Sequence, residues 1–370
     1  MNTVGKRMWI LRSVTLFLCV HYVAAWSDCS HDNGDPCGAG LPDKPHPTEG
    51  ISDLDQLDGG ETLRLGAFNI QIFGKSKAAK PEVMEVLGKI IRTYDIVAIQ
   101  EIRDKSQTAL PALVDVVNAN SSAPYDYIVS KRLGRTSSKE QYAYIYNNQI
   151  VELTGTPHTY PEPNGTDPFH REPYIASFRV LDGNFDATLI AIHTDPDEAT
   201  EEINALDAVV RYAQSTHPDE NDFIVVGDLN ADCTYFDEDS HSTMHSRGYY
   251  WCISNSVDTT TKPTDCTYDR IILTNPAVSD FTGDASVFRF DVEYTLNASE
   301  TTAVSDHYPV YAEFRCDRDA DSDPPPEVVR AVIALRIAVG SREYDPEPDI
   351  NGDGRVTSLD ALMILQATAV

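Results

Sequence analysis

The feature that most constrains the fold of this chain is the alternation of short apolar runs with amphipathic segments between Leu63 and Cys316. Runs such as LRLGAFNI, DIVAIQEI and DRIILT have the length and composition of strands, and a helical period marks residues 81–93, 108–119 and 198–214. Few helices fall between the middle runs. We therefore predict about ten strands in two mixed β-sheets that pack face to face, with helices covering the outside.

Polar side chains stand where these apolar runs stop: Asn69, Glu101, His193, Asp228, Asn230, Asp269, Asp306 and His307. An α/β domain builds its site from strand ends, so we expect these side chains to converge. Their carboxylate and amide oxygens suit Mg²⁺ or Ca²⁺. Each residue alone has a simpler interpretation, since Asp and Asn are common in turns and an isolated His is usually a hydrogen-bonded structural residue.

The N-terminal residues 1–25 have the form of a signal peptide, with basic residues, the apolar run SVTLFLCVHYVAA and a small-residue cleavage point. That run is shorter than the ~20 residues of a membrane span, and no later segment approaches this length. Residues 26–60 are rich in Gly, Pro and Asp and are predicted to form a linker pinned by Cys29 and Cys37. We expect an exported protein, extracellular or at the cell surface.

The charge of the chain limits its substrates. Its formal net charge is −29 at pH 7, and such a surface repels nucleic acid. A polyanionic substrate would therefore need bound cations and a few well-placed Arg or Lys side chains. One stretch, SKRLGRTSSKE at residues 130–140, is locally basic and by default is a solvated loop.

Beyond Cys316 the composition changes. Residues 317–326 are acidic and proline-rich, as in a linker, and two similar apolar segments at 329–339 and 359–369 predict paired helices. Between them DINGDGRVTSLD fits a calcium-binding loop of the EF-hand type, with ligands from Asp349, Asn351, Asp353, the carbonyl of Arg355, and Asp360. An earlier copy, DADSDPPPEVVR, is degenerate because Pro324 replaces the turn glycine and Arg330 the final acid. Residues 327–370 resemble a dockerin module with one intact calcium loop, which implies docking onto a cohesin-like scaffold protein.

A second resemblance covers nearly the whole large domain, residues 61–316. The motifs LGAFNIQIFG, AIQEIRD, LGRTSSKE, HREP, IAIHTDP, VGDLNADCTYF, TDCTYDRIIL and SDHYPV occur in the order found in the deoxyribonuclease I family, part of the endonuclease/exonuclease/phosphatase superfamily. The resemblance implies a four-layered α/β sandwich and a monomeric catalytic domain that hydrolyses DNA to 5′-phosphorylated products. It also implies Mg²⁺ or Mn²⁺ at the active site and a further Ca²⁺ in the catalytic domain.

The resemblance also implies roles for individual residues. The metal would be held by Asn69, Glu101 and Asp306, with Asp228 and Asn230 beside the scissile phosphate. His193 would pair with Glu140 and His307 with Asp269; one pair activates water and the other protonates the leaving oxygen, and we expect His307 to be the base. The substrate would be held by Arg103, Arg171, Tyr235 and Tyr268. Cys233 and Cys266 would form the family's disulfide, which leaves Cys252 and Cys316 as a second pair.

Two positions depart from the family pattern. Gln71 stands where an arginine usually reaches the DNA, and Ser138 replaces a tyrosine that stacks in the minor groove. Losing a cation and a stacking ring weakens duplex binding by roughly 1–3 kcal/mol each, so the preference for single- or double-stranded DNA stays open. Other functions also stay open: hydrolysis of a different phosphodiester, such as a sphingomyelin-type lipid, or a non-catalytic dockerin-bearing binding component.

Overall fold

The computed structural model describes residues 62–238, 240–316, 325–340 and 348–367. The predicted signal peptide, the linker with Cys29 and Cys37, and most of the acidic linker after Cys316 lie outside the described residues. In the part of the chain that is described, no helix is long and apolar enough to cross a membrane.

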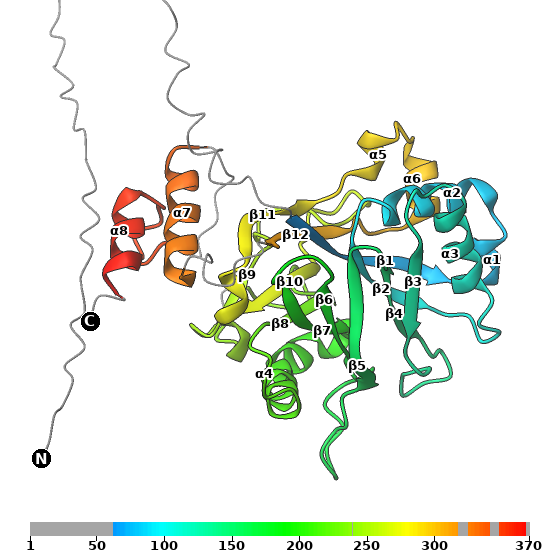
Figure 1. The fold of residues 1–370 in the computed structure, drawn as a ribbon, viewed down its shortest axis with the longest axis horizontal. Coiled ribbons are helices and arrows are strands. Elements are labelled where there is room, and N and C mark those ends of the chain that lie inside the picture. The colour runs from blue at the N-terminus through cyan, green and yellow to red at the C-terminus, as the bar shows by residue number, and fades with distance from the viewer. Residues whose placement is uncertain (1–61, 239, 317–324, 341–347, 368–370) are drawn as a thin grey trace, which may run out of the picture. The chain divides into compact units, whose positions relative to one another are not determined.

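The first of two six-stranded sheets has the order β11-β12-β1-β2-β4-β3 (Figure 1). The neighbours β1 and β2 are parallel and the other pairs are antiparallel, so the sheet is mixed. Its strands are β1 (Thr62–Phe73), β2 (Ile96–Ile102), β3 (Tyr125–Val129), β4 (Gln141–Asn147), β11 (Phe281–Val287) and β12 (Val310–Arg315).

The second sheet has the order β5-β6-β7-β8-β10-β9, and it is also mixed because β7 and β8 run parallel. Its strands are β5 (Val151–Thr159), β6 (Tyr174–Val180), β7 (Asp186–His193), β8 (Phe223–Asp228), β9 (Tyr249–Trp251) and β10 (Asp269–Thr274). In each sheet the parallel pair lies at the centre, and these central strands carry most of the polar strand ends described above.

Side-chain alternation explains why the sheets pack as layers. On β7, Leu189 belongs to the core between the two sheets, whereas Ile190 packs with Ile203 of α4 (Ala199–Thr216) on the outer face. On β1, Leu65 faces the inner core and Phe68 the outer one, which is closed by α2 (Pro81–Ile91) and α3 (Ala109–Ala119). A period of two sends successive side chains to opposite faces, so each central strand serves two cores.

The prediction of two packed mixed sheets flanked by helices is confirmed, with differences at the edges. The described residues hold twelve strands, and β5, β9 and β11, which the apolar pattern did not reveal, are all edge strands. An edge strand is covered on fewer sides and carries more polar residues, so its apolar signal is weak. The short helices α1 (Lys75–Ala78), α5 (Phe290–Glu293) and α6 (Ala298–Val304) were missed as well.

Gly227 sets the close contact between the two central strands of the second sheet. Its φ is +143°, and a Cβ at this position would lie 2.0 Å from the carbonyl oxygen of Ile192. Only glycine fits such a backbone approach. The β7 and β8 strands can therefore end in register, with His193 opposite Asp228.

The two described helices after Cys316 are α7 (Pro326–Ala338) and α8 (Ser358–Gln366), which contact each other. The loop before α8 closes around Asp349, whose carboxylate oxygens accept hydrogen bonds from the backbone N–H groups of Gly352 and Gly354, both at 2.8 Å. Asp360 is buried, and its Oδ2 accepts from the backbone and hydroxyl of Thr357, both at 2.9 Å. The first of the two predicted helices begins three residues earlier than the sequence pattern indicated, at Pro326, because proline is well suited to the first turn.

Candidate active site

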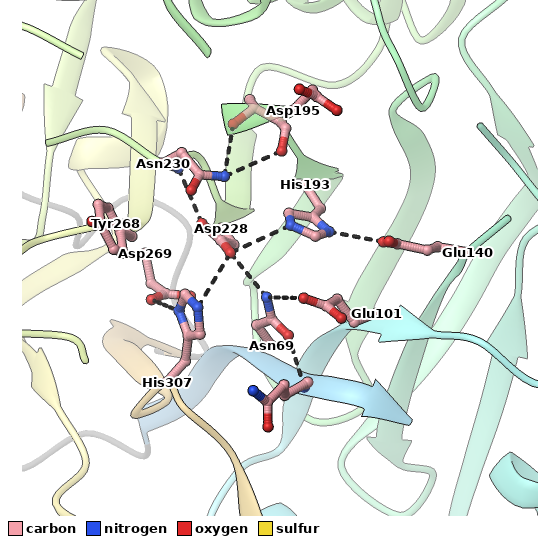
Figure 2. Close-up of polar contacts among 12 residues, drawn as sticks. Asn69, Glu101, Glu140, His193, Asp195, Asp228, Asn230, Tyr268, Asp269 and His307 are labelled. Carbon is pink, nitrogen blue, oxygen red and sulfur yellow. Dashed lines mark hydrogen bonds and ion pairs between the residues drawn. The ribbon is translucent and has the colours of Figure 1, made fainter. Parts of the chain in front are cut away.

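Two histidines from different sheets approach one carboxylate oxygen (Figure 2). The Nε2 atom of His193, at the end of β7, lies 3.5 Å from Oδ2 of Asp228, and Nε2 of His307, which precedes β12, lies 3.6 Å from the same oxygen. Asp228 is 2 % exposed and ends β8. Both imidazoles thus direct their Nε2 atoms at Oδ2 of Asp228.

The opposite nitrogen of each ring is held by a carboxylate. Nδ1 of His193 lies 2.9 Å from Oε2 of Glu140, and Nδ1 of His307 lies 2.8 Å from Oδ2 of Asp269. Both carboxylates are almost completely buried. A carboxylate at Nδ1 fixes the ring orientation and stabilises the imidazolium, so each Nε2 can exchange a proton with a group near Asp228.

The charges around these pairs shift their pKa values. Burial would lower the pKa of His307, but Asp269, Asp228 and Asp306 together raise it to about 10. Burial raises the pKa of the Asp269 carboxyl to about 6, against the opposing effect of His307. In this arrangement His307 carries its proton at neutral pH.

In the His193–Glu140 pair, nearby arginines offset the negative charge of the carboxylate. Burial would raise the pKa of Glu140, yet His193, Arg171 and Arg103 lower it to about 2. The pKa of His193 is raised because the attraction of Glu140 and Asp228 exceeds the effects of burial and of Arg171, which lower it. Glu140 is thus an anion over the whole physiological pH range.

Asn69 and Glu101 meet next to Asp228. The Nδ2 of Asn69 donates to Oδ2 of Asp228 at 2.9 Å and to Oε1 of Glu101 at 3.2 Å, while its Oδ1 accepts the N–H of Gln71. Asn69 therefore directs an amide N–H at these carboxylates and orients them. Its predicted role as a metal ligand stays a prediction.

The backbone that presents Glu101 is irregular. The register of β1 against β2 shifts between Asn69 and Phe73, and Gln71, Ile72 and Glu101 all have φ between +40° and +60°. Positive φ is uncommon for residues other than glycine and a clear outlier for a β-branched one such as Ile72, whose N–H donates to Oε2 of Glu101 at 2.8 Å. This irregular backbone presents the Glu101 carboxylate to Asn69 and to the N–H of Ile72.

Asp306 has an unusual environment. Its Oδ2 lies 2.7 Å from Nζ of Lys262, and its Oδ1 is buried with no hydrogen-bond partner among the described residues. Oδ1 of Asp269 is likewise buried and unpartnered within the described structure. Buried carboxylate oxygens are normally hydrogen-bonded, so Oδ1 of Asp306 is available to a divalent cation. In addition, Asp228, Asp269 and His307 each offer one ligand atom within 4.8 Å of the others.

The two predicted substrate arginines are engaged inside the site. Arg103 Nη2 lies 2.7 Å from Oε1 of Glu140 and 3.1 Å from Oε2 of Glu101, and so it links the two carboxylates. Arg171 is buried and donates from Nε to the carbonyl of His193 and from Nη2 to that of Thr194, at 2.9 and 2.8 Å. Both contacts position the histidine side of the site. Their predicted grip on the substrate stays a prediction.

The remaining predicted residues border the same centre. Asn230 has φ +48° and donates from Nδ2 to the carbonyl of Thr194 at 3.2 Å. The rings of Tyr235 and Tyr268 lie 5.5 Å apart, and Tyr268 lies 6.1 Å from the ring of His307. An aromatic pair, exposed at Tyr235 and half-buried at Tyr268, therefore adjoins the catalytic candidates.

Sequence reasoning missed two residues that shape this centre. Lys262 pairs with Asp306, and the hydroxyl of Tyr142 accepts the backbone N–H of His193 at 3.0 Å. Lys262 stands in an ordinary polar loop, and Tyr142 occupies one of the apolar positions of a predicted strand. Neither carried a local signal, because each acts across a contact between segments distant in the sequence.

The structure contains the expected Cys233–Cys266 disulfide. The second pair suggested by the sequence, Cys252 with Cys316, is not formed, although both residues are buried. Cys252 follows β9 of the second sheet and Cys316 follows β12 of the first. The two side chains therefore reach the shared core from opposite sheets.

Comparison with known proteins identifies the class. The model of the endonuclease/exonuclease/phosphatase family matches residues 66–307, which include all the residues labelled in Figure 2. Deoxyribonuclease-1-like 2 of Mus musculus is 36% identical over 264 residues, covering 70% of this chain and 93% of that protein. Deoxyribonuclease-1 of Bos taurus is 36% identical over 261 residues, covering 68% and 92%, and deoxyribonuclease gamma of Mus musculus is 36% identical over 266 residues, covering 69% and 86%.

The family match covers most of the chain, and the three relatives are each 36% identical to it. Together they show the family of the protein. The chain belongs to the deoxyribonuclease I family, within the endonuclease/exonuclease/phosphatase family, and it is a hydrolytic nuclease.

Proposed function

We propose that this protein is a secreted, metal-dependent endonuclease that hydrolyses DNA phosphodiester bonds to 5′-phosphorylated and 3′-hydroxyl products. The observation that carries the proposal is the convergence of His193 and His307 on Oδ2 of Asp228, each with its other nitrogen held by a buried carboxylate. In-line hydrolysis needs one group that takes a proton from water and another that gives one to the leaving oxygen. Two opposed imidazoles at one point can supply both.

The metal site that we propose uses carboxylate oxygens. Glu101 and Asp306 would hold Mg²⁺ or Mn²⁺, with Asn69 beside them, and the unpartnered Oδ1 of Asp306 supports this assignment. When bound, the cation would neutralise negative charge on the phosphate as the transition state forms. This would also offset the repulsion between DNA and a chain of net charge −29.

The two histidines divide the proton transfers. We propose that His307, with Asp269, accepts the proton of water, and that His193, with Glu140, protonates the 3′ oxygen. The three carboxylates that raise the pKa of His307 to about 10 keep it protonated, which opposes a base role. The assignment therefore requires the negative charge around His307 to be neutralised first, which is the condition created by a bound divalent cation. Asp228 and Asn230 would lie beside the phosphate.

Around this centre, Arg103 and Arg171 would contact phosphate, and the Tyr235–Tyr268 pair would contact sugar and bases. The basic loop of residues 130–140 has less free positive charge for binding DNA than its sequence indicated. Arg135 pairs with Asp167 and Glu198, at 2.9 and 2.5 Å, so much of its charge is used within the protein.

The C-terminal part has its own proposed role. We propose that residues 349–360 bind Ca²⁺ and that residues 327–370 form a dockerin-like docking module for a cohesin-like scaffold protein. In support, α7 and its C-cap residue expose apolar side chains at positions that share one helix face: Val328, Val332, Leu335 and Val339. Scattered apolar exposure is ordinary, but a stripe at this spacing fits a protein contact.

The decisive experiment uses purified residues 26–370 with plasmid and single-stranded DNA, in Mg²⁺ and Ca²⁺ and then in EDTA, beside the His193→Ala protein. Cutting that requires both metal and His193 is expected. Ligation of the products without prior phosphorylation would report 5′-phosphate ends. If a folded protein cuts neither DNA, hydrolysis of a sphingomyelin-type lipid or another phosphodiester becomes the function to test.

A further inference from the structure

Lys262 makes an ion pair at a position where a metal ligand is expected. Its Nζ lies 2.7 Å from Oδ2 of Asp306, and the two side chains are 55% and 11% exposed, respectively. The other oxygen of Asp306 is buried without a hydrogen-bond partner among the described residues. One oxygen of this carboxylate is thus paired with an ammonium group, and the other makes no hydrogen bond in the described part of the chain and lies 3.9 Å from Nε2 of His307.

The backbone around Lys262 is fixed, although its side chain is half exposed. The N–H of Thr261 donates to the carbonyl of Asp306 at 2.9 Å, and the N–H of Tyr308 donates to the carbonyl of Thr259 at 2.8 Å. The same loop ends at Cys266, which is held by its disulfide to Cys233. A long, flexible stem on an anchored backbone lets the ammonium move by several ångströms while the loop stays in place.

The charges around Asp306 disfavour binding of the Lys262 ammonium and a metal ion at the same time. An ammonium and a divalent cation that share Asp306 repel each other, because like charges a few ångströms apart in a partly buried site are only weakly screened. The cation that binds Asp306 more strongly therefore displaces the other. A displaced Lys262 would stay tethered beside His307, next to the position proposed for the scissile phosphate.

We propose that Lys262 is an exchangeable cation: it neutralises Asp306 while no metal is bound, and when metal takes Asp306 it is released to contact a phosphate of the substrate. This inference rests on the proposed function, in particular on a metal site that includes Glu101 and Asp306. It makes Lys262 a substrate-positioning residue whose contribution appears only in the metal-bound protein.

Mn²⁺ affinity gives the first test. Binding is followed by the electron paramagnetic resonance signal of free Mn²⁺ in full-length wild type, Lys262→Met and Lys89→Met. Lys89 is the matched control because it also forms a lysine–carboxylate pair, at 2.9 Å from Glu85, but on the surface of α2. The catalytic site is defined as the Mn²⁺ binding that Glu101→Gln removes. Lys262→Met is expected to bind Mn²⁺ at this site three- to tenfold more tightly, and Lys89→Met like wild type.

DNA affinity gives the second test, in a His193→Ala background that prevents cutting. With Mn²⁺ present, Lys262→Met is expected to weaken binding of a short duplex three- to tenfold and to reduce the slope of log K against log salt by about one. Without Mn²⁺ the substitution should change DNA affinity by less than twofold, because Lys262 is then held by Asp306. If Lys262 only supported the fold, Lys262→Met would weaken DNA binding equally with and without Mn²⁺.

The outcomes separate this inference from the function on which it rests. Unchanged or weaker Mn²⁺ binding by Lys262→Met, at a site that wild type retains, overturns the exchange alone. Equal loss of DNA affinity with and without Mn²⁺ also overturns it. If wild type has no Glu101-dependent Mn²⁺ site, the proposed metal site itself fails, and the exchange fails with it.

Discussion

His193 ends a strand of one sheet and His307 precedes a strand of the other, yet their Nε2 atoms lie 3.5 and 3.6 Å from the same oxygen of Asp228. Because the opposite nitrogens are held by Glu140 and Asp269, both rings have one defined orientation. The arrangement is therefore built for two proton transfers at one point, which is why the carboxylates behind the rings are the first residues to test.

Asp269→Asn is expected to lower kcat by 10²- to 10⁴-fold with little change in fold, because an amide of the same shape fills the buried position but no longer stabilises the His307 imidazolium. His193→Ala and His307→Ala should each remove more than nine-tenths of the activity. Steady-state cutting of plasmid DNA measures the loss, and circular dichroism checks the fold. Asp115→Asn, on the exposed side of α3, is the control, and activity above a tenth of wild type in either alanine variant rejects the acid–base roles.

Stability should fall in acid through Glu140. The pKa of this carboxyl is about 2 in the folded protein against 4.5 for an unperturbed glutamate, so its contribution is fully present above pH 4.5 and is lost as the pH falls toward 2. The contribution is at most about 3 kcal/mol. Urea unfolding at intervals between pH 2 and 6 measures it. Glu140→Gln should flatten this acid dependence, and an unchanged acid limb in that variant would contradict the assignment.

Gln71→Arg and Ser138→Tyr should shift the substrate preference toward duplex DNA. A guanidinium and a stacking ring each add roughly 1–3 kcal/mol to duplex binding where they reach the groove. The ratio of KM values for duplex and single-stranded substrates reports the effect, with kcat expected to stay within threefold. The double variant should combine both gains; a ratio equal to that of wild type would mean that neither side chain reaches the DNA.

Gly227→Ala should destabilise the domain by about 2–5 kcal/mol, because the new methyl group would collide with the Ile192 carbonyl and alanine is strained at φ +143°. Gly165→Ala offers a control, since its φ is also positive but nothing lies within 4 Å of its Cβ. Denaturant unfolding compares the two. A loss no greater than that of the control would show that the β7–β8 contact relaxes easily.

Calcium should stabilise the C-terminal module through the loop at residues 349–360. At 100 times the dissociation constant, ligand binding adds about 2.7 kcal/mol to the free energy of unfolding. Asp353→Ala should abolish a Ca²⁺ binding event seen by calorimetry. Asp321→Ala, in the degenerate earlier loop, should leave that event intact, and loss of binding in this variant would instead assign calcium to both loops.

The sequence by itself determined the architecture and pointed to most of the residues that the structure brings together at the candidate site. Apolar runs of strand length reported the central strands because those strands are buried on both faces, and the polar residues that end them, such as His193 and Asp228, marked one edge of the domain. The order of the motifs gave the family. These signals are local, so they survive without coordinates.

Only the tertiary structure decided how these groups are paired and charged. The ion pair of Lys262 with Asp306 joins residues 44 positions apart, and the carbonyls bound by Arg171 belong to a strand end more than twenty positions away. Edge strands such as β5 also became visible only through their partners. Long-range contacts and burial determine these pairings and edge strands, and neither can be predicted from a short segment of sequence.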